Sequence, residues 1–264
     1  MTILDQLAAH AGERVNEARL RTPLSDIRNQ ALSMPKRDFE FEKALKTPDI
    51  AFICECKKAS PSKGLIAPDF PYLEIAKAYE NAGADCISVL TEPRWFLGSD
   101  IFLKEIASAV SIPCLRKDFT VDEYMIYEAR LLGASAVLLI CSILTGSQLK
   151  EYMAICDELG LTALVEAHDE KEVALAVSAG ARVIGVNNRN LKDFTIDTEN
   201  SRRLRSLIPG ETLFVSESGV RNSDDIARLR DMGADAVLVG EALMRAADKK
   251  AMLAQLKGSV PQNE

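Results

Sequence analysis

Charged side chains stand at the end of the first apolar segment of this 264-residue chain. The segment covers residues 51–56, and Glu55 and Lys57 lie at its end. Alternation along a β-strand would place both side chains on the same face as Ile53. Charges are seldom buried without a partner or a chemical task. This pair therefore predicts either acid–base chemistry or a structural ion pair, and alternation alone does not decide between them.

Polar side chains also stand at the ends of later apolar segments, namely Lys117, Glu166, Asn187 and Glu217. In a parallel barrel these ends meet at one rim, so we expect these four side chains to converge with Glu55 and Lys57 on one pocket. Lysines and carboxylates in a dry pocket shift one another's pKa values and divide acid and base roles. His168 is either a further catalytic group or a residue that supports the start of the next helix.

Two glycine-containing turns near the end of the chain suggest an anion site. Ser218-Gly219 follows the seventh apolar segment, and Gly240-Glu241 follows the eighth. Glycine allows backbone N–H groups to approach an anion, and barrels commonly bind phosphate after their last two strands. A simple turn is the alternative for each glycine, but the two positions together favour phosphate binding.

Eight short apolar segments have the character of β-strands, with room for one helix in each gap. They cover residues 51–56, 86–90, 113–116, 136–140, 162–165, 183–186, 213–216 and 236–239. A Gly-Ala pair precedes each even-numbered segment. A glycine suits the end of a preceding helix, where the backbone often adopts the left-handed αL conformation. The pattern predicts an α/β protein of the (β/α)8 TIM-barrel type. A doubly wound sheet is the rival, but it usually has fewer strands and a glycine-rich dinucleotide loop.

About 50 residues precede the first predicted strand. Apolar residues recur there with helical spacing, at Ile3, Leu4, Leu7, Ala8, Ala11 and Val15. We therefore expect residues 1–50 to form a helical N-terminal extension of a single barrel domain that covers residues 1–264. Its first helix either covers the barrel floor or forms a lid near the active site. After the third strand, Thr120 and Glu123 predict a capping box.

Composition excludes several classes of protein. The net charge of −7 argues against nucleic-acid and membrane-surface partners, which are polyanions. Neither a long apolar run nor a secretory signal is present, which predicts a cytoplasmic protein. The six cysteines form no CxxC pair and the chain has only two histidines. We therefore expect reduced thiols and no metal site.

The motifs resemble those of the indole-3-glycerol-phosphate synthase family over nearly the whole chain. The most specific of them is FICECKKASPS at residues 52–62. The resemblance continues at residues 88–92, 116–119, 164–166, 185–189, 216–219 and 239–241. The glycine motifs are shared with many phosphate-binding barrels. Asn190 stands where aspartate is common, and residues 94–97 are one version of a variable loop.

The resemblance implies a lyase of tryptophan biosynthesis that needs no cofactor or metal. Such enzymes convert 1-(2-carboxyphenylamino)-1-deoxyribulose 5-phosphate into indole-3-glycerol phosphate, carbon dioxide and water. By the same resemblance Lys117 is the acid near the ketone, and Glu166 transfers protons as water is lost. Glu55 and Asn187 assist, and Glu217 belongs to the same catalytic group. Lys57 offsets the negative charge of the substrate and holds or protonates it, which leaves the division of acid steps between the lysines open.

The resemblance also implies which residues bind the substrate. Arg189 and Ser60 hold it, and Phe96 and Phe119 flank its aryl ring. The phosphate lies at Ser218, Gly219, Gly240 and the backbone of Glu241. Trp95, beside Phe96, either adds to the aromatic wall or only packs the loop.

Three rivals remain. Phosphoribosylanthranilate isomerase uses a cysteine and an aspartate and has no need of an inward Glu-x-Lys. A flavin-binding oxidoreductase can place its cofactor phosphate on the same rim, and a silent barrel would only bind a phosphorylated metabolite. The length leaves no room for a second, fused barrel. We expect a phosphorylated small molecule as the partner, and a monomer is favoured.

Overall fold

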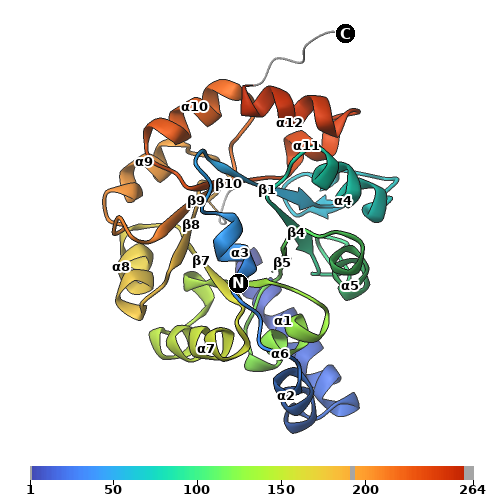
Figure 1. Cartoon of the computed structure of the whole chain (residues 1–264). Helices are drawn as coiled ribbons and strands as arrows, with labels where there is room; N and C mark the ends of the chain where they lie inside the picture. The colour runs from blue at the N-terminus through green and yellow to red at the C-terminus, as the bar shows by residue number, and fades with distance from the viewer. Residues whose placement is uncertain (1, 191–193, 259–264) are drawn as a thin grey trace.

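The computed structural model describes residues 2–190 and 194–258. Eight parallel strands close into a barrel in the order β1-β10-β9-β8-β7-β6-β5-β4, and helices surround it (Figure 1). The predicted (β/α)8 barrel and helical N-terminal segment are therefore confirmed.

The barrel strands match the eight predicted segments to within one or two residues at each end. They are β1 (Ala51–Cys56), β4 (Cys86–Leu90), β5 (Cys114–Lys117), β6 (Ala136–Ile140), β7 (Thr162–Ala167), β8 (Val183–Asn187), β9 (Leu213–Glu217) and β10 (Ala236–Val239). A small antiparallel ribbon of β2 (Ala59–Ser60) and β3 (Gly64–Leu65) follows β1. This ribbon belongs to the loop that carries Ser60 over the barrel mouth.

Helices follow the strands around the outside of the barrel. They are α4 (Tyr72–Asn81), α5 (Asp100–Ala109), α6 (Glu123–Leu131), α7 (Gly146–Leu159), α8 (Glu170–Ala179), α9 (Glu199–Arg205), α10 (Ser223–Asp231), α11 (Glu241–Arg245) and α12 (Lys249–Lys257), with the short 3-10 helix η1 (Cys141–Ile143) after β6. Gly83, Gly133, Gly180 and Gly233 all have left-handed φ angles at the helix ends, as predicted. The predicted capping box at Thr120 is wrong: Asp122, next to the first helical residue, caps α6 by accepting the N–H of Tyr124.

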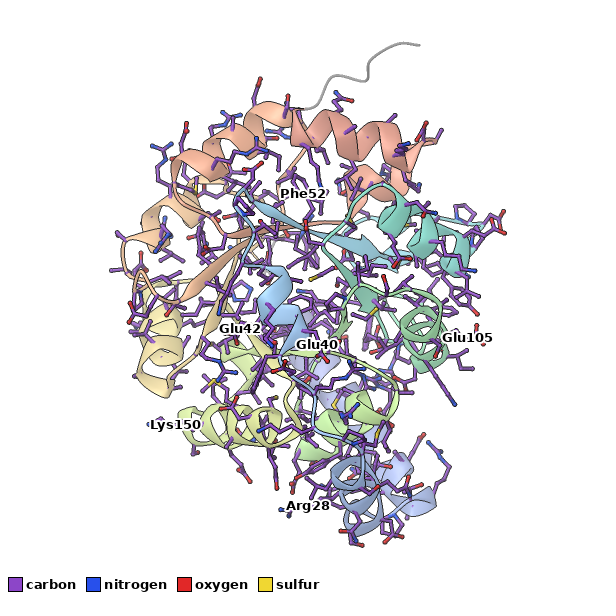
Figure 2. The ribbon with its side chains drawn as sticks, in the orientation of Figure 1. Arg28, Glu40, Glu42, Phe52, Glu105 and Lys150 are labelled. Atoms are coloured by element: carbon purple, nitrogen blue, oxygen red, sulfur yellow. The ribbon has the colours of Figure 1, made fainter. Side chains whose placement is uncertain are left out.

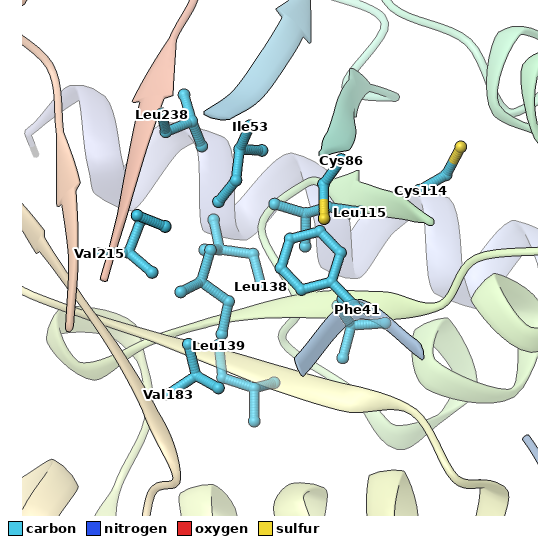
Figure 3. Packing of buried hydrophobic residues seen from close by; sticks show 14 of the residues in the cluster. Phe41, Ile53, Cys86, Cys114, Leu115, Leu138, Leu139, Val183, Val215 and Leu238 are labelled. Carbon is cyan, nitrogen blue, oxygen red and sulfur yellow. The ribbon is translucent and has the colours of Figure 1, made fainter. Parts of the chain in front are cut away.

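Inside the barrel, an apolar layer lies beneath a polar one. Ile53, Leu115, Leu164, Val183 and Val215 are fully buried, and Figure 3 shows all of these but Leu164 labelled around the interior. Alternation places the next inward residue of each strand two positions further on. Those positions carry Glu55, Lys117, Glu166, Gly185 and Glu217, so the same periodicity that fills the core raises functional groups to the mouth.

The N-terminal extension occupies both ends of the barrel. Its helices are α1 (Ile3–Arg21), α2 (Leu24–Ser33) and α3 (Glu40–Ala44). α3 lies at the floor, where the N–H of Glu42 donates to Thr162 at the start of β7 and Phe41 is buried against the core (Figure 3). α1 lies at the opposite end and contacts the loops after β4 and β5. The first helix is therefore at the active-site end, and α3 covers the floor.

The outer helices present charged side chains to solvent. Figure 2 shows Arg28, Glu105 and Lys150 on the periphery, and all three are exposed. Among the helices within residues 2–190 and 194–258, none combines the length and the apolar character needed to cross a membrane.

Candidate active site

A cavity of about 640 Å³ opens at the carboxyl ends of the strands. All the residues predicted for the site line it. The catalytic candidates among them are Glu55, Lys57, Lys117, Glu166, Asn187 and Glu217, and the binding candidates are Ser60, Phe96, Phe119, Arg189, Ser218, Gly219, Gly240 and Glu241. Because parallel strands end at one rim, residues from the whole length of the chain meet in this one cavity.

Lys117 lies between two buried carboxylates. Its Nζ is 2.6 Å from Oε2 of Glu217 and 3.0 Å from Oε2 of Glu166, and the lysine side chain is only 14% exposed. Burial lowers the pKa of Lys117, but the charges of Glu166, Glu217 and Glu55 outweigh burial and raise this pKa above its usual range. Lys117 is therefore an ammonium ion with a proton to donate.

The two carboxylates have opposite pKa shifts. Burial raises the pKa of Glu166, but Lys117 and His168 outweigh burial and lower this pKa below its usual range. Burial raises the pKa of Glu217 to about 7, and the charge of Glu166 adds to this effect while Lys117 opposes it. The two shifts have opposite directions, so the surroundings favour ionisation of Glu166 more than ionisation of Glu217, a difference that separates acid and base roles.

Glu55 and Lys57 form the second charged pair of the cavity. Oε1 of Glu55 lies 2.5 Å from Nζ of Lys57, and Glu55 is buried. The sequence left open whether this pair is structural or chemical, and the structure shows an ion pair that lines the cavity. A Cβ at Gly240 would lie 2.4 Å from Glu55 Oε1 and 2.9 Å from Lys57 Nζ. Glycine at position 240 therefore makes room for the pair, a reason that sequence analysis did not foresee.

Gly185 makes room for Glu217 in the same way. A Cβ at Gly185 would lie 2.3 Å from Oε1 of Glu217. Gly185 is on β8 and pairs with Val215 of β9, two residues before Glu217, so the absent side chain leaves space inside the barrel for the carboxyl group. A glycine within a predicted strand was the available signal, since such a glycine marks close approach of other atoms.

The loop after β9 has a backbone conformation that favours glycine. Ser218 and Gly219 have consecutive left-handed φ angles of 68° and 96°. Glycine is required at 219 for a second reason, because a Cβ there would lie 2.7 Å from Cγ2 of Thr198. Backbone N–H groups of such turns can bind an anion, and a glycine lets the anion approach closely. Gly240 stands at the start of α11 on the same side of the cavity.

Two adjacent asparagines brace this loop. Oδ1 of Asn187 accepts hydrogen bonds from the Ser218 hydroxyl and from the N–H of Arg189, both at 3.0 Å. The buried Asn188 donates to the carbonyl of Ser218 at 3.1 Å and accepts from the N–H and hydroxyl of Ser201. No role was predicted for Asn188, although it lies within the motif at residues 185–189, just after a predicted strand.

Aromatic and aliphatic side chains form the opposite wall. The rings of Phe96 and Phe119 lie 6.0 Å apart, and Ile3, Leu4 and Leu7 of α1 line the same cavity. Trp95, by contrast, packs edge-on against His10 at 5.4 Å and does not line the cavity. The loop thus contributes Phe96 to the aromatic wall and uses Trp95 for packing.

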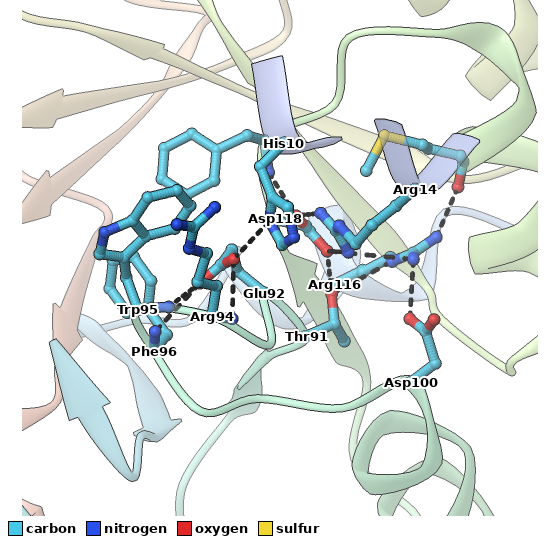
Figure 4. Close-up of polar contacts among 12 residues, drawn as sticks. His10, Arg14, Thr91, Glu92, Arg94, Trp95, Phe96, Asp100, Arg116 and Asp118 are labelled. Carbon is cyan, nitrogen blue, oxygen red and sulfur yellow. Dashed lines mark hydrogen bonds and ion pairs between the residues drawn. The ribbon is translucent and has the colours of Figure 1, made fainter. Parts of the chain in front are cut away.

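Buried polar contacts hold the α1 side of the mouth together (Figure 4). Arg14 of α1 donates two hydrogen bonds to Asp118, the residue after Lys117, at 2.6 and 3.1 Å. The fully buried Glu92 accepts the N–H groups of Arg94, Trp95 and Phe96 and contacts His10. The contacts of Arg14 with Asp118 and of His10 with Glu92 join residues that are far apart in the chain, so no local sequence pattern indicates them.

The cysteines, possible metal ligands and His168 are the other groups in the sequence that could do chemistry. All six cysteines are buried and unpaired by disulfides, and burial raises the pKa of Cys54 above its usual range. Within residues 2–190 and 194–258, no group of three or more His, Cys, Asp or Glu side chains could hold a metal ion. His168 does not line the cavity but lies behind Glu166, with Nε2 at 3.3 Å from Oε1 of that residue.

A family model and similar proteins of known sequence agree on one family. The family model described as indole-3-glycerol phosphate synthase matches residues 4–256. A protein of that name from Ruminiclostridium cellulolyticum is 57% identical over 97% of this chain and 99% of its own length. One from Leuconostoc mesenteroides is 51% identical over the same shares of the two chains. Among solved structures, 3-hexulose-6-phosphate synthase from Salmonella typhimurium is 15% identical, with a TM-score of 0.65 over 81% of this chain and 100% of its own, and shares the fold.

Proposed function

The chain belongs to the indole-3-glycerol phosphate synthase family, and we propose that its cavity closes the indole ring of that product. The substrate is 1-(2-carboxyphenylamino)-1-deoxyribulose 5-phosphate, and the enzyme is a carboxy-lyase. The main support for the proposal is the ammonium group of Lys117, which is buried in the cavity between Glu166 and Glu217. The turn at Ser218-Gly219, at one end of the cavity, suits a phosphate.

Lys117 is the acid of ring closure. A ring carbon attacks the ketone carbon, and the ketone oxygen must take up a proton as the C–C bond forms. The raised pKa of Lys117 keeps its Nζ protonated and charged, and burial strengthens the attraction of this charge to the developing oxyanion. Loss of carbon dioxide from the same ring carbon then restores the aromatic ring.

Glu166 transfers protons during the loss of water. The new hydroxyl leaves with a proton, and a neighbouring carbon gives up a proton to a base. Glu166 is ionised and lies beside Lys117, so acid and base stand next to each other at the reacting carbons. Glu55 and Asn187 assist, and Glu217 can exchange a proton with Lys117 through their contact.

The substrate is held at both ends. Backbone N–H groups of Ser218, Gly219, Gly240 and Glu241 bind the phosphate, and the carboxylate of Glu241 is already paired with Arg245 at 3.1 Å. Phe96 and Phe119 enclose the aryl ring, while Ser60 and Arg189 hold the polar part. Lys57 offsets the substrate's negative charge and holds or protonates it.

The remaining proposals concern the whole molecule. We propose that the extension and barrel form one functional domain, because Leu4 and Leu7 of α1 line the cavity. We also propose that the protein is a cytoplasmic monomer and that it acts on a phosphorylated small molecule.

The test supplies the purified chain with this substrate alone, in EDTA and without cofactors, and follows indole fluorescence. We expect fluorescence to rise with time. A parallel reaction with phosphoribosylanthranilate should give no product, because that isomerisation needs a different pair of groups. Turnover of the second compound and not the first would refute the proposal.

A further inference from the structure

His168 lies between two carboxylates from different elements. Its Nδ1 is 3.0 Å from Oε2 of Glu172 on α8, and its Nε2 is 3.3 Å from Oε1 of Glu166 on β7. The side chain is only 16% exposed. A neutral imidazole carries one N–H, so one of its nitrogens would turn a lone pair towards a carboxylate, whereas an imidazolium presents a positive N–H to both carboxylates.

Glu172 fixes the orientation of this ring. Its Oε2 accepts the backbone N–H of His168 at 2.8 Å as well as Nδ1, and its other oxygen accepts the hydroxyl of Ser142. The ring therefore has one orientation, with Nε2 towards Glu166. That contact satisfies an ion-pair distance but not hydrogen-bond geometry, so charge is its main contribution.

The remaining groups around the ring do not offset its charge. Asp169, which caps α8, adds a third acidic group beside it, and Cys141 of η1 presents a thiol to the backbone of Glu172. Lys117 contacts Oε2 of Glu166, whereas His168 contacts Oε1 of the same carboxylate. Glu166 is therefore placed between two nitrogen cations, one facing the cavity and one behind it.

We propose that His168 is a positioning residue, a permanent imidazolium that keeps Glu166 ionised and aimed at Lys117. This inference rests on the proposed role of Glu166. Burial alone would favour transfer of a proton from Lys117 to Glu166, which would leave a neutral pair. A fixed charge behind Glu166 opposes that transfer and so keeps the acidic proton on Lys117. The raised pKa of His168, about 10, agrees: burial lowers it, and Glu166 and Glu172 outweigh burial.

The direct test is a histidine-ring NMR titration of the whole protein, which does not depend on turnover. The chain has two histidines, so His10→Asn leaves one ring to observe. We expect both ring nitrogens of His168 to stay protonated from about pH 6 to about pH 9. In Glu166→Gln and in Glu172→Gln the titration midpoint should fall by about one pH unit or more.

Kinetics supply the second readout. His168→Gln keeps a donor and the backbone bond to Glu172 but removes the charge, and we expect kcat to fall about tenfold with KM little changed, as a one-unit shift in proton balance requires. A His168 that titrates below about pH 7, or a midpoint unmoved in both glutamine variants, would overturn the inference. So would wild-type kcat in His168→Gln. Inactive wild-type protein with the expected NMR result would instead contradict the proposed function.

Discussion

Gly185→Ala should displace Glu217 from Lys117 while the barrel stays folded. The new Cβ would lie 2.3 Å from Oε1 of Glu217 and 3.3 Å from its Cδ, so the carboxyl group must move by about 1 Å to reach ordinary contact. Glu217 is 2% exposed, and the space open to its carboxyl group is the cavity that it lines. Its 2.6 Å contact with Lys117 would lengthen or break.

The expected effects are large on catalysis and moderate on stability. A misplacement of about 1 Å near reacting groups costs roughly 100-fold in rate. Overpacking of a buried site costs about 1–3 kcal/mol of the free energy of unfolding. Gly185 has no left-handed φ angle, so alanine brings no backbone strain of that kind. We therefore expect kcat to fall about 100-fold, measured by indole fluorescence, in a variant that still unfolds cooperatively.

Two further variants separate this cause from general damage. Gly12→Ala makes the same substitution on α1, where a Cβ would meet nothing within 4 Å, and should keep full activity. In a Glu217→Ala background the obstructed side chain is gone, so adding Gly185→Ala should change kcat by less than about twofold. If Gly185→Ala keeps the kcat of the wild type, the proposed displacement of Glu217 is wrong. It is also wrong if the double variant loses as much kcat as the two single variants lose in combination.

The remaining predictions concern three other residues. Glu166→Gln keeps the size of the side chain but removes its charge, so kcat should fall about 10²–10⁴-fold; unchanged kcat would assign the base role elsewhere. Asn188→Asp keeps the acceptor for Ser201 but loses the donor to the Ser218 carbonyl, so KM should rise more than kcat falls; equal KM for wild type and variant would contradict the bracing role. The pKa of His168 is raised to about 10, so its contribution to stability is complete below about pH 6.5 and is lost as pH rises through about 10. The unfolding free energy of the wild type should exceed that of His168→Gln, and this difference should be greatest at the low-pH end of the window. A difference that does not change with pH would contradict the assignment.

Much of the site followed from strand alternation. The positions of Glu55, Lys117, Glu166 and Glu217 are each two residues beyond a buried apolar residue of the same strand, and periodicity makes that visible in the sequence. Their convergence follows because parallel strands end at one rim. The roles of these residues remain predictions that came from the family resemblance.

Contacts between distant segments could not be predicted in this way. Arg14 and Asp118 are 104 positions apart, and no local pattern pairs them. Asp122 rather than Thr120 caps α6. Both side chains can cap a helix, and the path of the loop decides between them. The reason for glycine at 240 also lies in another strand, where Glu55 and Lys57 occupy the space of the missing side chain.

The central claim is that Lys117 supplies the proton for ring closure. Lys117→Met keeps a long side chain and removes the ammonium, so turnover in the fluorescence assay should fall by about 10²–10⁴-fold, as loss of a general acid predicts. Binding of the product, measured by calorimetry, shows whether the cavity stays intact. We expect Lys117→Met to lose turnover of the substrate and to retain binding of the product. A Lys117→Met enzyme that keeps most of its activity would contradict the account.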